Sequence, residues 1–419
     1  MIGSVAPFVG AGVSFVRGGS DSLQPETRLE QYLLADVTEI VEQCAPQGSD
    51  EFVFIDDASV DAVTKRVATP RRMLVTGAPK SASQPVRAGD VLVGRTHPER
   101  NAVALISPPL AGAFASTGHS VLRPRPELLD DRYLYWWVQS PEFVAGLVRR
   151  GSGGNAATVT DASVRSMPIP LPPIRDQQRI AGILDDVVQL RFERLAALDL
   201  LAEFAESLVL DAVYGADPGV LSDLVESIEY GPSAKDVAPR GTVTASILRA
   251  SSITSDGDLD LTELPDRRLT PADAGRFAVR PGEVLFCRAG NAESAPRVAL
   301  FRGQEPEGSV LPAEPRALVP APSVMRLRVR PEHASDGSGE YLAAFFAGPH
   351  GTAACRSLAS FTPRTLRDLA IPLPSADARE VFAQRIEQLT RARTNERIQL
   401  ARLDELFAAL QSNGFSGRL

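Results

Sequence analysis

The chain repeats itself, and this repetition constrains its fold more than any other feature of the sequence. Residues 160–172 read TDASVRSMPIPLP and residues 362–374 read TPRTLRDLAIPLP, with Thr, Arg, Ile, Pro and Leu recurring in register. Two earlier pairs of segments match in the same order, VRAGDVLVGRT at 86–96 with VRPGEVLFCRA at 279–289, and more weakly YLYWW at 133–137 with YLAAF at 341–345. Because the spacing between matched blocks differs, we expect two copies of one scaffold whose loops vary in length.

A long helical segment follows each IPLP block. Neither the segment from Arg175 to Val213 nor the one from about Ala378 to Asn413 contains proline, and in both apolar residues recur every three or four positions. A helix of about 38 residues is roughly 57 Å long, and a single apolar stripe needs a partner, so we expect an antiparallel coiled coil. Charged residues interrupt both stripes, which allows either a cross-helix ion pair or simple solvation: Arg191, Arg194, Arg393 and Glu396.

The segments between the helices contain short apolar runs such as VLVGR and VALIS, bounded by Gly and Pro, a pattern typical of small sheet-rich domains. The sequence therefore predicts a mixed α/β fold with two similar α/β domains, joined by two long antiparallel helices as a pseudo-two-fold internal duplication. We expect the first domain over 1–173, the first long helix over 174–214, the second domain over 215–375 and the second long helix over 376–419.

Composition narrows the class of protein. A hydrophobic fraction of 44% with 23% charged residues is that of a globular protein. No run of about 20 apolar residues is present, no signal peptide is recognised, and three widely spaced cysteines predict neither disulfides nor a metal cluster. We therefore expect a cytoplasmic protein. The net charge of −8 means that a nucleic-acid binder of this composition must gather its basic residues on one surface or depend on a partner.

Several motifs together resemble one known family. IPLPPIRDQQRIAGILDDVVQL, with the leucine-rich helix and ESLVLDAVYGADP after it, is similar to the central region of the specificity subunits of type I restriction-modification systems. The C-terminal LDELFAALQSNGFSGRL resembles the end of the same family. ILRASSITSDGDLDLTEL and VRPGEVLFCRAGN resemble its second target-recognition domain. The resemblance covers nearly the whole chain, in the expected order.

The resemblance implies a non-catalytic DNA reader in a phage-defence system. Each target-recognition domain would contact one half of a split target in double-stranded DNA, and the helices would act as a ruler. They would also dock two DNA methyltransferase (modification) subunits, which restriction and translocation subunits would join. S-adenosylmethionine, ATP and Mg²⁺ are expected on those partners and no cofactor in this chain. The alternative is a structural adaptor of a DNA-defence complex with little intrinsic sequence specificity, which the acidic net charge favours slightly.

No catalytic motif accompanies these features. Phosphate-binding loops, dinucleotide fingerprints, HExxH and paired CxxC are absent from the sequence, as is the Asn/Asp-Pro-Pro-aromatic motif of adenine methyltransferases. The four histidines are scattered and are expected to be surface or structural residues rather than catalytic ones. Trp136 and Trp137, in the apolar YLYWW run, are expected in a core rather than as platforms for base stacking.

Candidate DNA-binding residues fall in loops, where Arg favours guanine edges, Asn favours adenine and Gly/Ser backbones approach phosphates. One group follows the GDVLV run and has a counterpart in the second half: Arg95, Thr96, His97, Arg100 and Asn101, with Arg288, Asn291 and Arg297. A second group surrounds GSGGN and its counterpart: Arg149, Arg150, Ser152, Asn155 and Arg364. A third rests on the family resemblance: Tyr230, Ser233, Lys235, Arg249 and Ser251. The alternatives are a solvated turn, a flexible connector, and ordinary packing or surface residues, respectively.

Overall fold

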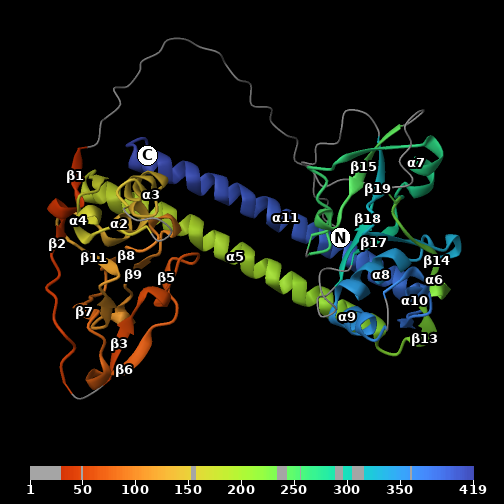
Figure 1. Ribbon diagram of the computed structural model, residues 1–419, viewed down its shortest axis with the longest axis horizontal. Coiled ribbons are helices and arrows are strands. Elements are labelled where there is room, and N and C mark those ends of the chain that lie inside the picture. Colours follow the sequence, from red (N-terminus) through yellow and green to blue (C-terminus); the bar gives the residue numbers. More distant parts are fainter. Residues whose placement is uncertain are drawn as a thin grey trace, which may run out of the picture. The chain divides into compact units, whose positions relative to one another are not determined.

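The computed structural model describes residues 30–48, 51–151, 157–233, 243–254, 256–287, 296–303, 316–358 and 361–419. The chain divides into two units, each with its own core (Figure 1). Unit 1 comprises the described part of Met1–Gln189 together with Leu403–Leu419, and unit 2 comprises that of Leu190–Arg402. The two long helices, α5 (Ile174–Val213) and α11 (Ala376–Phe415), contribute one part to each unit.

Unit 1 is built from short strands and helices. Its described strands are β1 (Gln31–Leu33), β2 (Thr38–Glu39), β3 (Glu51–Ile55), β4 (Val60–Asp61), β5 (Arg66–Val67), β6 (Arg71–Leu74), β7 (Ala82–Pro85), β8 (Val91–Gly94), β9 (Val103–Leu105), β10 (Phe114–Ser116), β11 (His119–Pro124) and β12 (Pro168–Pro170). Its helices besides the long ones are α1 (Leu34–Val37), α2 (Asp131–Trp137), α3 (Pro141–Val148) and α4 (Asp161–Arg165), with the 3-10 turns η1 (Asp57–Ser59), η2 (Val75–Gly77), η3 (Pro98–Arg100) and η4 (Pro108–Leu110).

Two four-stranded sheets and two antiparallel ribbons, of which β4–β5 is the smaller, organise the described part of unit 1. One sheet has the order β2–β11–β8–β9 with antiparallel neighbours. A second has the order β6–β3–β10–β7, in which β3 and β10 run parallel. The ribbon β1–β12 is antiparallel and leads directly into α5.

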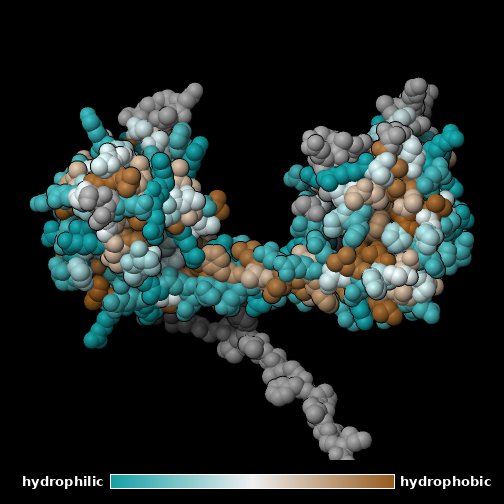
Figure 2. All heavy atoms as spheres, turned by 90° about the horizontal axis from the view of Figure 1, so that it is seen from below, coloured by the Kyte–Doolittle hydropathy of each residue, from teal (hydrophilic) through white to brown (hydrophobic). Residues whose placement is uncertain are grey.

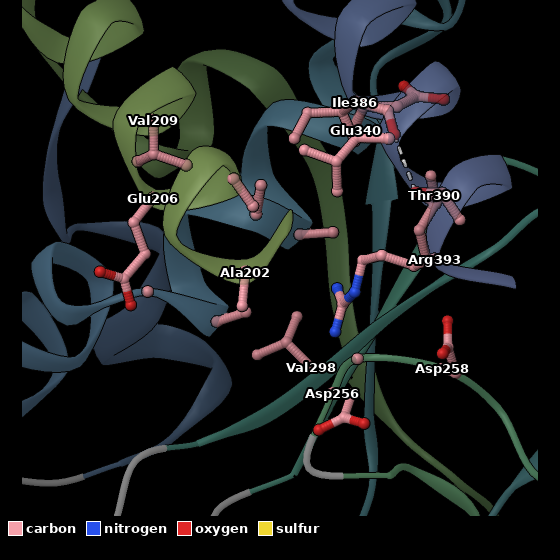
Figure 3. A pocket seen from close by; sticks show the side chains of 18 of the residues that line it. Ala202, Glu206, Val209, Asp256, Asp258, Val298, Glu340, Ile386, Thr390 and Arg393 are labelled. Atoms are coloured by element: carbon pink, nitrogen blue, oxygen red, sulfur yellow. Dashed lines mark hydrogen bonds between the residues drawn. The ribbon is translucent and has the colours of Figure 1, made fainter. Parts of the chain in front are cut away.

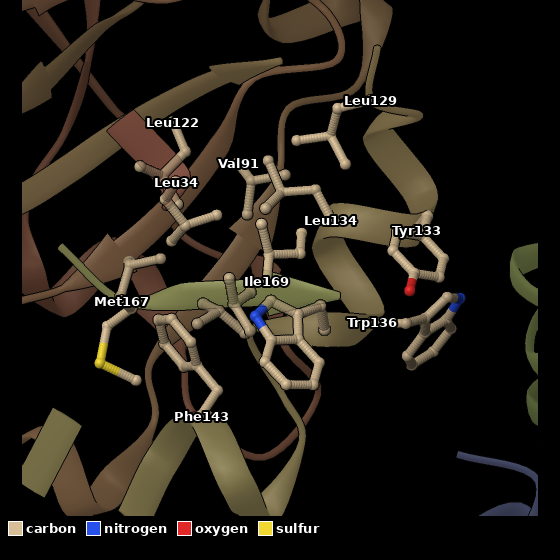
Figure 4. Packing of buried hydrophobic residues seen from close by; sticks show 14 of the residues in the cluster. Leu34, Val91, Leu122, Leu129, Tyr133, Leu134, Trp136, Phe143, Met167 and Ile169 are labelled. Carbon is tan, nitrogen blue, oxygen red and sulfur yellow. The ribbon is translucent and has the colours of Figure 1, made fainter. Parts of the chain in front are cut away.

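The main core of unit 1 lies where α2 packs on the first sheet (Figure 4). Trp136 and Trp137 are only 6% and 7% exposed, which confirms that they belong to a core. Ile180 of α5 and Phe415 of α11 are buried in the same cluster. The long helices are therefore part of the unit's interior and not an appendage to it.

Unit 2 is built in the same way. Its described strands are β13 (Asp217–Val220), β14 (Val225–Tyr230), β15 (Val243–Leu248), β16 (Asp266–Leu269), β17 (Glu283–Cys287), β18 (Arg297–Phe301), β19 (Ala317–Pro320), β20 (Met325–Val329) and β21 (Ala370–Leu373). Its shorter helices are α6 (Leu221–Leu224), α7 (Pro271–Phe277), α8 (Ser338–Ala347), α9 (Pro349–Arg356) and α10 (Pro363–Arg367), with the 3-10 turns η6 (Ala250–Ser252) and η7 (Pro331–His333). The sheets have the orders β14–β20–β17–β18 and β16–β15–β19, and the ribbon is β13–β21.

The two units share one topology. The sheet β14–β20–β17–β18 repeats β2–β11–β8–β9, the ribbon β13–β21 repeats β1–β12, and the parallel pair β15–β19 repeats β3–β10. Equivalent hydrogen bonds recur: Tyr133 Oη donates to the carbonyl of Pro170 at 2.9 Å, and Tyr341 Oη donates to that of Pro372 at 2.7 Å. The predicted duplication of a mixed α/β fold is confirmed.

The repeated sequence blocks now have a physical reason. In the first copy of the GDV/GEV block, Asp90 accepts a hydrogen bond from the backbone N–H of Arg87 and forms an ion pair with Arg123 of β11. In the second, Glu283 accepts the N–H of Arg280 and pairs with Arg328 of β20. The threonine that opens each IPLP block caps α4 or α10 by accepting a backbone N–H three residues on.

The long helices pair antiparallel, as predicted. In unit 1 the first part of α5 shares a core with the last part of α11, and in unit 2 the last part of α5 shares a core with the first part of α11. Within unit 2, Arg194 Nη1 lies 3.1 Å from Glu396 Oε2, so the cross-helix ion pair is present. Two residues beyond the end of each helix lies a glycine with left-handed φ, 75° at Gly215 and 74° at Gly417. Among the described residues, no helix is both long enough and apolar enough to cross a membrane.

Candidate DNA-binding surface

The first candidate loop, after β8, is held in place by a segment far along the chain. The N–H of His97 donates to the carbonyl of Ala157, and the N–H of Val159 donates to that of Arg95, both at 2.9 Å. His97 and Asn101 adopt left-handed φ values of 53° and 49°, which permit the tight turn at η3. The loop is therefore a fixed structure on the surface of unit 1.

Lys65 also fixes this loop, although sequence reasoning did not identify it as part of the site. Its Nζ donates to the carbonyl of Asn101 at 2.6 Å and to that of Arg100 at 3.5 Å. Burial lowers the pKa of the Lys65 amine, an effect that the nearby Asp61 carboxylate opposes. The amine thus acts as a clamp for the backbone, and no sequence motif connects it to a loop 35 residues away.

The structure brings the loop after β8 together with the end of α3. η3 packs against α3, so Arg100 lies in the same region as Arg149 and Arg150. The side chains of all three are exposed, and among the described residues none of them makes an ion pair within 4 Å. We call these three residues the basic edge of unit 1. Two further candidates of this region, Ser152 and Asn155, lie outside the described residues.

The remaining loop residues are placed differently. Arg95 is half-buried, and its guanidinium donates to the carbonyl of Thr117, so a contact with a base would require it to leave this carbonyl. Thr96 is exposed and bridges to Thr158 through its backbone, while His97 Nδ1 lies 2.9 Å from Glu99 Oε1. The basic edge, rather than Arg95, presents exposed positive charge in this conformation, with Arg150 Nη1 donating to the carbonyl of Gly146.

In unit 2 the candidates form two groups. Around η6, Arg249 and Ser251 are exposed, and Arg297 Nη1 reaches the carbonyl of Ile253 at 3.5 Å. The equivalent loop candidates Arg288 and Asn291, as well as Lys235, lie outside the described residues.

The second group lies where β14 packs against α10. Tyr230 Oη donates to the carbonyl of Phe361 at 3.3 Å, and Arg364 of α10 is exposed. Ser233 lies two residues beyond Gly231, next to Pro232, whose carbonyl accepts a hydrogen bond from Arg267. The structure thus brings Tyr230 close to α10, although the sequence analysis placed Tyr230 and Arg364 in separate groups.

A buried charge network supports the first sheet of unit 2. Arg326 of β20 is 2% exposed, donates to the carbonyls of Arg276 and Ala278, and lies 3.2 Å from Glu229 and 3.6 Å from Glu283. Burial lowers the pKa of Arg326, and the two carboxylates oppose that shift. This network stabilises β14, the strand that ends at Tyr230, against its neighbour β20.

Comparison with known proteins gives a consistent result. Residues 86–199 match the family described as type I restriction modification DNA specificity domain. The specificity subunit of the type I restriction enzyme EcoKI from Escherichia coli (strain K12) is 23% identical over 345 residues, which are 74% of this chain and 68% of that protein.

Two solved structures share the fold. One, from work on complex assembly and conformational transition of the type I R-M system, aligns over 96% of this chain and 100% of its own, with a TM-score of 0.60 and 21% identity. The S subunit of a type I restriction-modification system from M. genitalium aligns over 94% of this chain and 98% of its own, with a TM-score of 0.53 and 9% identity. By the domain matched over residues 86–199 and by the curated relative, the chain is similar to the specificity subunits of type I restriction-modification systems, and the two solved structures share its duplicated fold.

Proposed function

We propose that this chain reads a bipartite target in double-stranded DNA, with each unit contacting one half-site. The observation that carries the proposal is the repeated topology, because two copies of one fold on a single chain supply two equivalent readers. The basic edge of unit 1 supplies cations for phosphates. In unit 2 the exposed residues around η6 and α10 would contact the phosphates. Because these basic residues are gathered on local surfaces, the chain can bind DNA despite its overall net charge of −8.

The chain would act as the non-catalytic, docking component of a larger complex. Large apolar side chains on the unit 2 part of α5 are exposed, as expected of a surface that binds other subunits (Figure 2): Phe192, Leu195, Leu200, Phe204 and Leu210. Two DNA methyltransferase subunits would bind there and carry S-adenosylmethionine, while restriction subunits would bring ATP and Mg²⁺. In the described ranges, no group of three His, Cys, Asp or Glu side chains is arranged to hold a metal ion.

Selection from a random DNA library tests the proposal. The full chain is incubated with the library, alone and with the modification subunits, and the bound DNA is sequenced. We expect enrichment of two short motifs separated by a fixed gap. Salt-sensitive binding without any motif would contradict the proposal and favour the structural adaptor.

The basic edge has its own test. Changing Arg100, Arg149 and Arg150 together to glutamine should reduce the slope of log affinity against log salt by about three, since each phosphate contact contributes about 0.9. The loss of affinity should be nearly the same on all sequences, because phosphate contacts carry no base information. Filter binding of the complex over a range of salt concentrations measures both quantities.

A matched control removes the same charge elsewhere in unit 1. Arg72, Arg87 and Arg125 are exposed arginines outside the candidate groups, and their triple glutamine variant should leave the slope nearly unchanged. Equal reductions in the two triple variants would show that only net charge matters and would exclude the basic edge as a contact surface.

A further inference from the structure

The two units differ where α2 or α8 packs against the long helices. In unit 1 three rings fill this place: the centroids of Tyr135 and Trp136 lie 4.8 Å apart, and those of Trp136 and Phe407 lie 5.5 Å apart. Trp136 Nε1 also donates to Asp185 of α5 at 2.8 Å. The junction between the globular fold and the helices of unit 1 is thus closed by aromatic side chains.

Unit 2 carries alanine at all three equivalent positions. The aligned YLYWW and YLAAF blocks, and two long helices of 40 residues each, place Ala343, Ala344 and Ala205 where unit 1 has its three rings, in that order. The hydrogen bonds of Tyr133 and Tyr341, which open the two blocks, show that the alignment holds in space. Unit 2 therefore lacks the side chains that close the junction in unit 1.

A cavity occupies this part of unit 2 (Figure 3). Its volume is about 320 Å³, and all three alanines line it. Apolar side chains from both long helices, α8 and β18 form one part of the remaining wall: Ala202, Val209, Val298, Leu300, Ala347, Ile386 and Leu389. Charged and polar side chains form the other part: Glu206, Asp256, Asp258, Arg302, Glu340, His350, Thr390 and Arg393. An apolar cavity of roughly 150 Å³ holds benzene. The space in unit 2 is large enough for a bicyclic ring.

Arg393 of α11 extends into the cavity toward Val298 (Figure 3). Its Nε is buried without a hydrogen-bond partner, and within the described part of the chain its guanidinium makes no ion pair. The two nearby carboxylates, Asp256 and Asp258, both pair with Arg397 instead. The planar guanidinium of Arg393 is therefore available to stack on a ring inside the cavity.

We propose that this cavity binds a small planar aromatic molecule of about the size of indole, in the place that unit 1 fills with its own Trp136 and Phe407. The apolar side chains of the wall contact the ring, and Arg393 stacks on its face. Such a ligand would stiffen the junction between the sheets of unit 2 and the long helices. This site is separate from the candidate DNA-binding residues, and the proposal does not depend on the function proposed above.

Titration calorimetry of the full-length chain with indole tests the proposal. We expect saturable binding at one site per chain, lost in both Ala344→Trp and Ala205→Phe, because each change returns a ring to the cavity. Arg393→Met should weaken binding about two- to five-fold, the ratio that corresponds to a cation–π contact. As a matched control, Ala272→Phe adds a ring at an exposed position of α7 and should leave binding unchanged.

Two results would overturn the proposal: no saturable binding of indole to the native chain, or undiminished binding in both ring-restoring variants. Should those variants fail to fold, the native protein still decides the question. In alanine-methyl-labelled native protein, indole should shift the NMR signals of Ala205, Ala343 and Ala344. Shifts confined to other methyl groups would place any binding outside this cavity and refute the assignment.

Discussion

We expect Trp136→Ala to lower the free energy of unfolding of unit 1 by about 3–5 kcal/mol, the usual cost of truncating a buried large aromatic side chain. Trp136 is 6% exposed and packs on Tyr135 and Phe407, so its removal leaves a void and removes one of the aromatic contacts between α2 and α11. It also leaves Asp185 without the hydrogen bond from the indole N–H. Denaturant unfolding, followed by hydrogen exchange in each unit, measures the loss.

The readout separates the units. Amides of β8 and β11 in unit 1 should exchange faster, while those of β17 and β20 in unit 2 should keep their protection. Trp136→Phe is the matched control, because it keeps a ring against Phe407 and removes only the hydrogen bond, and it should cost a smaller fraction of the stability. A loss below about 0.5 kcal/mol for Trp136→Ala, the range of ordinary surface substitutions, would show that this ring does not close the junction.

The second large effect concerns the proposed spacing of half-sites. Each long helix contributes to both units, so inserting seven residues, two turns, into α5 after Arg194 and into α11 before Glu396 lengthens each helix by about 10 Å. At about 3.4 Å per base pair, the accepted gap between half-sites should grow by about three base pairs. The half-site sequences themselves should not change, since neither insertion touches a sheet or a loop.

The DNA-library selection described above, repeated on this variant with the modification subunits, measures the new gap. An insertion in α11 alone is the control: it breaks the register between Arg194 and Glu396 and should weaken selection without producing a new gap. If the double insertion left the original gap unaltered, the ruler mechanism would be wrong, although each unit could still read DNA.

Much of this fold was predictable because the sequence contains an internal repeat, whose two copies can be aligned with each other. The repeated IPLP and GDV/GEV blocks predicted two similar α/β units, and proline-free segments with a helical apolar period predicted α5 and α11. The charge that interrupts each apolar stripe led to the Arg194–Glu396 pair, although the sequence left simple solvation open. These features depend on short-range patterns, which a sequence displays directly.

The arrangement of the candidate site was not predictable in the same way. The loop after β8 is held by Ala157 and Val159, and by Lys65, whose amine binds backbone carbonyls. Such partners are distant in sequence, and a backbone acceptor has no residue type that a motif could show. That Arg95 would turn toward the carbonyl of Thr117 also depended on tertiary packing, whereas the roles of the loop residues in DNA binding stay predictions.

The cavity of unit 2 was visible in the sequence only as a difference. Judged by sequence similarity, the segments YLYWW and YLAAF are only a weak match. Once the fold shows the two segments to be equivalent helices, the same letters show that two aromatic side chains in one copy are alanine in the other. A third exchange, Phe407 for Ala205, lies on helices whose common register only the structure establishes.

The division of the chain has a consequence for its biosynthesis. The core of unit 1 includes Phe415 and its partly buried neighbours Phe407 and Leu410, whereas all of unit 2 lies between Leu190 and Arg402. A ribosome therefore finishes the second unit before it has made the last pieces of the first. Until residues 403–419 emerge, the rings of Tyr133, Trp136 and Trp137 lack their aromatic neighbours from α11. During synthesis the core of the first unit therefore stays partly exposed until residues 403–419 pack against it.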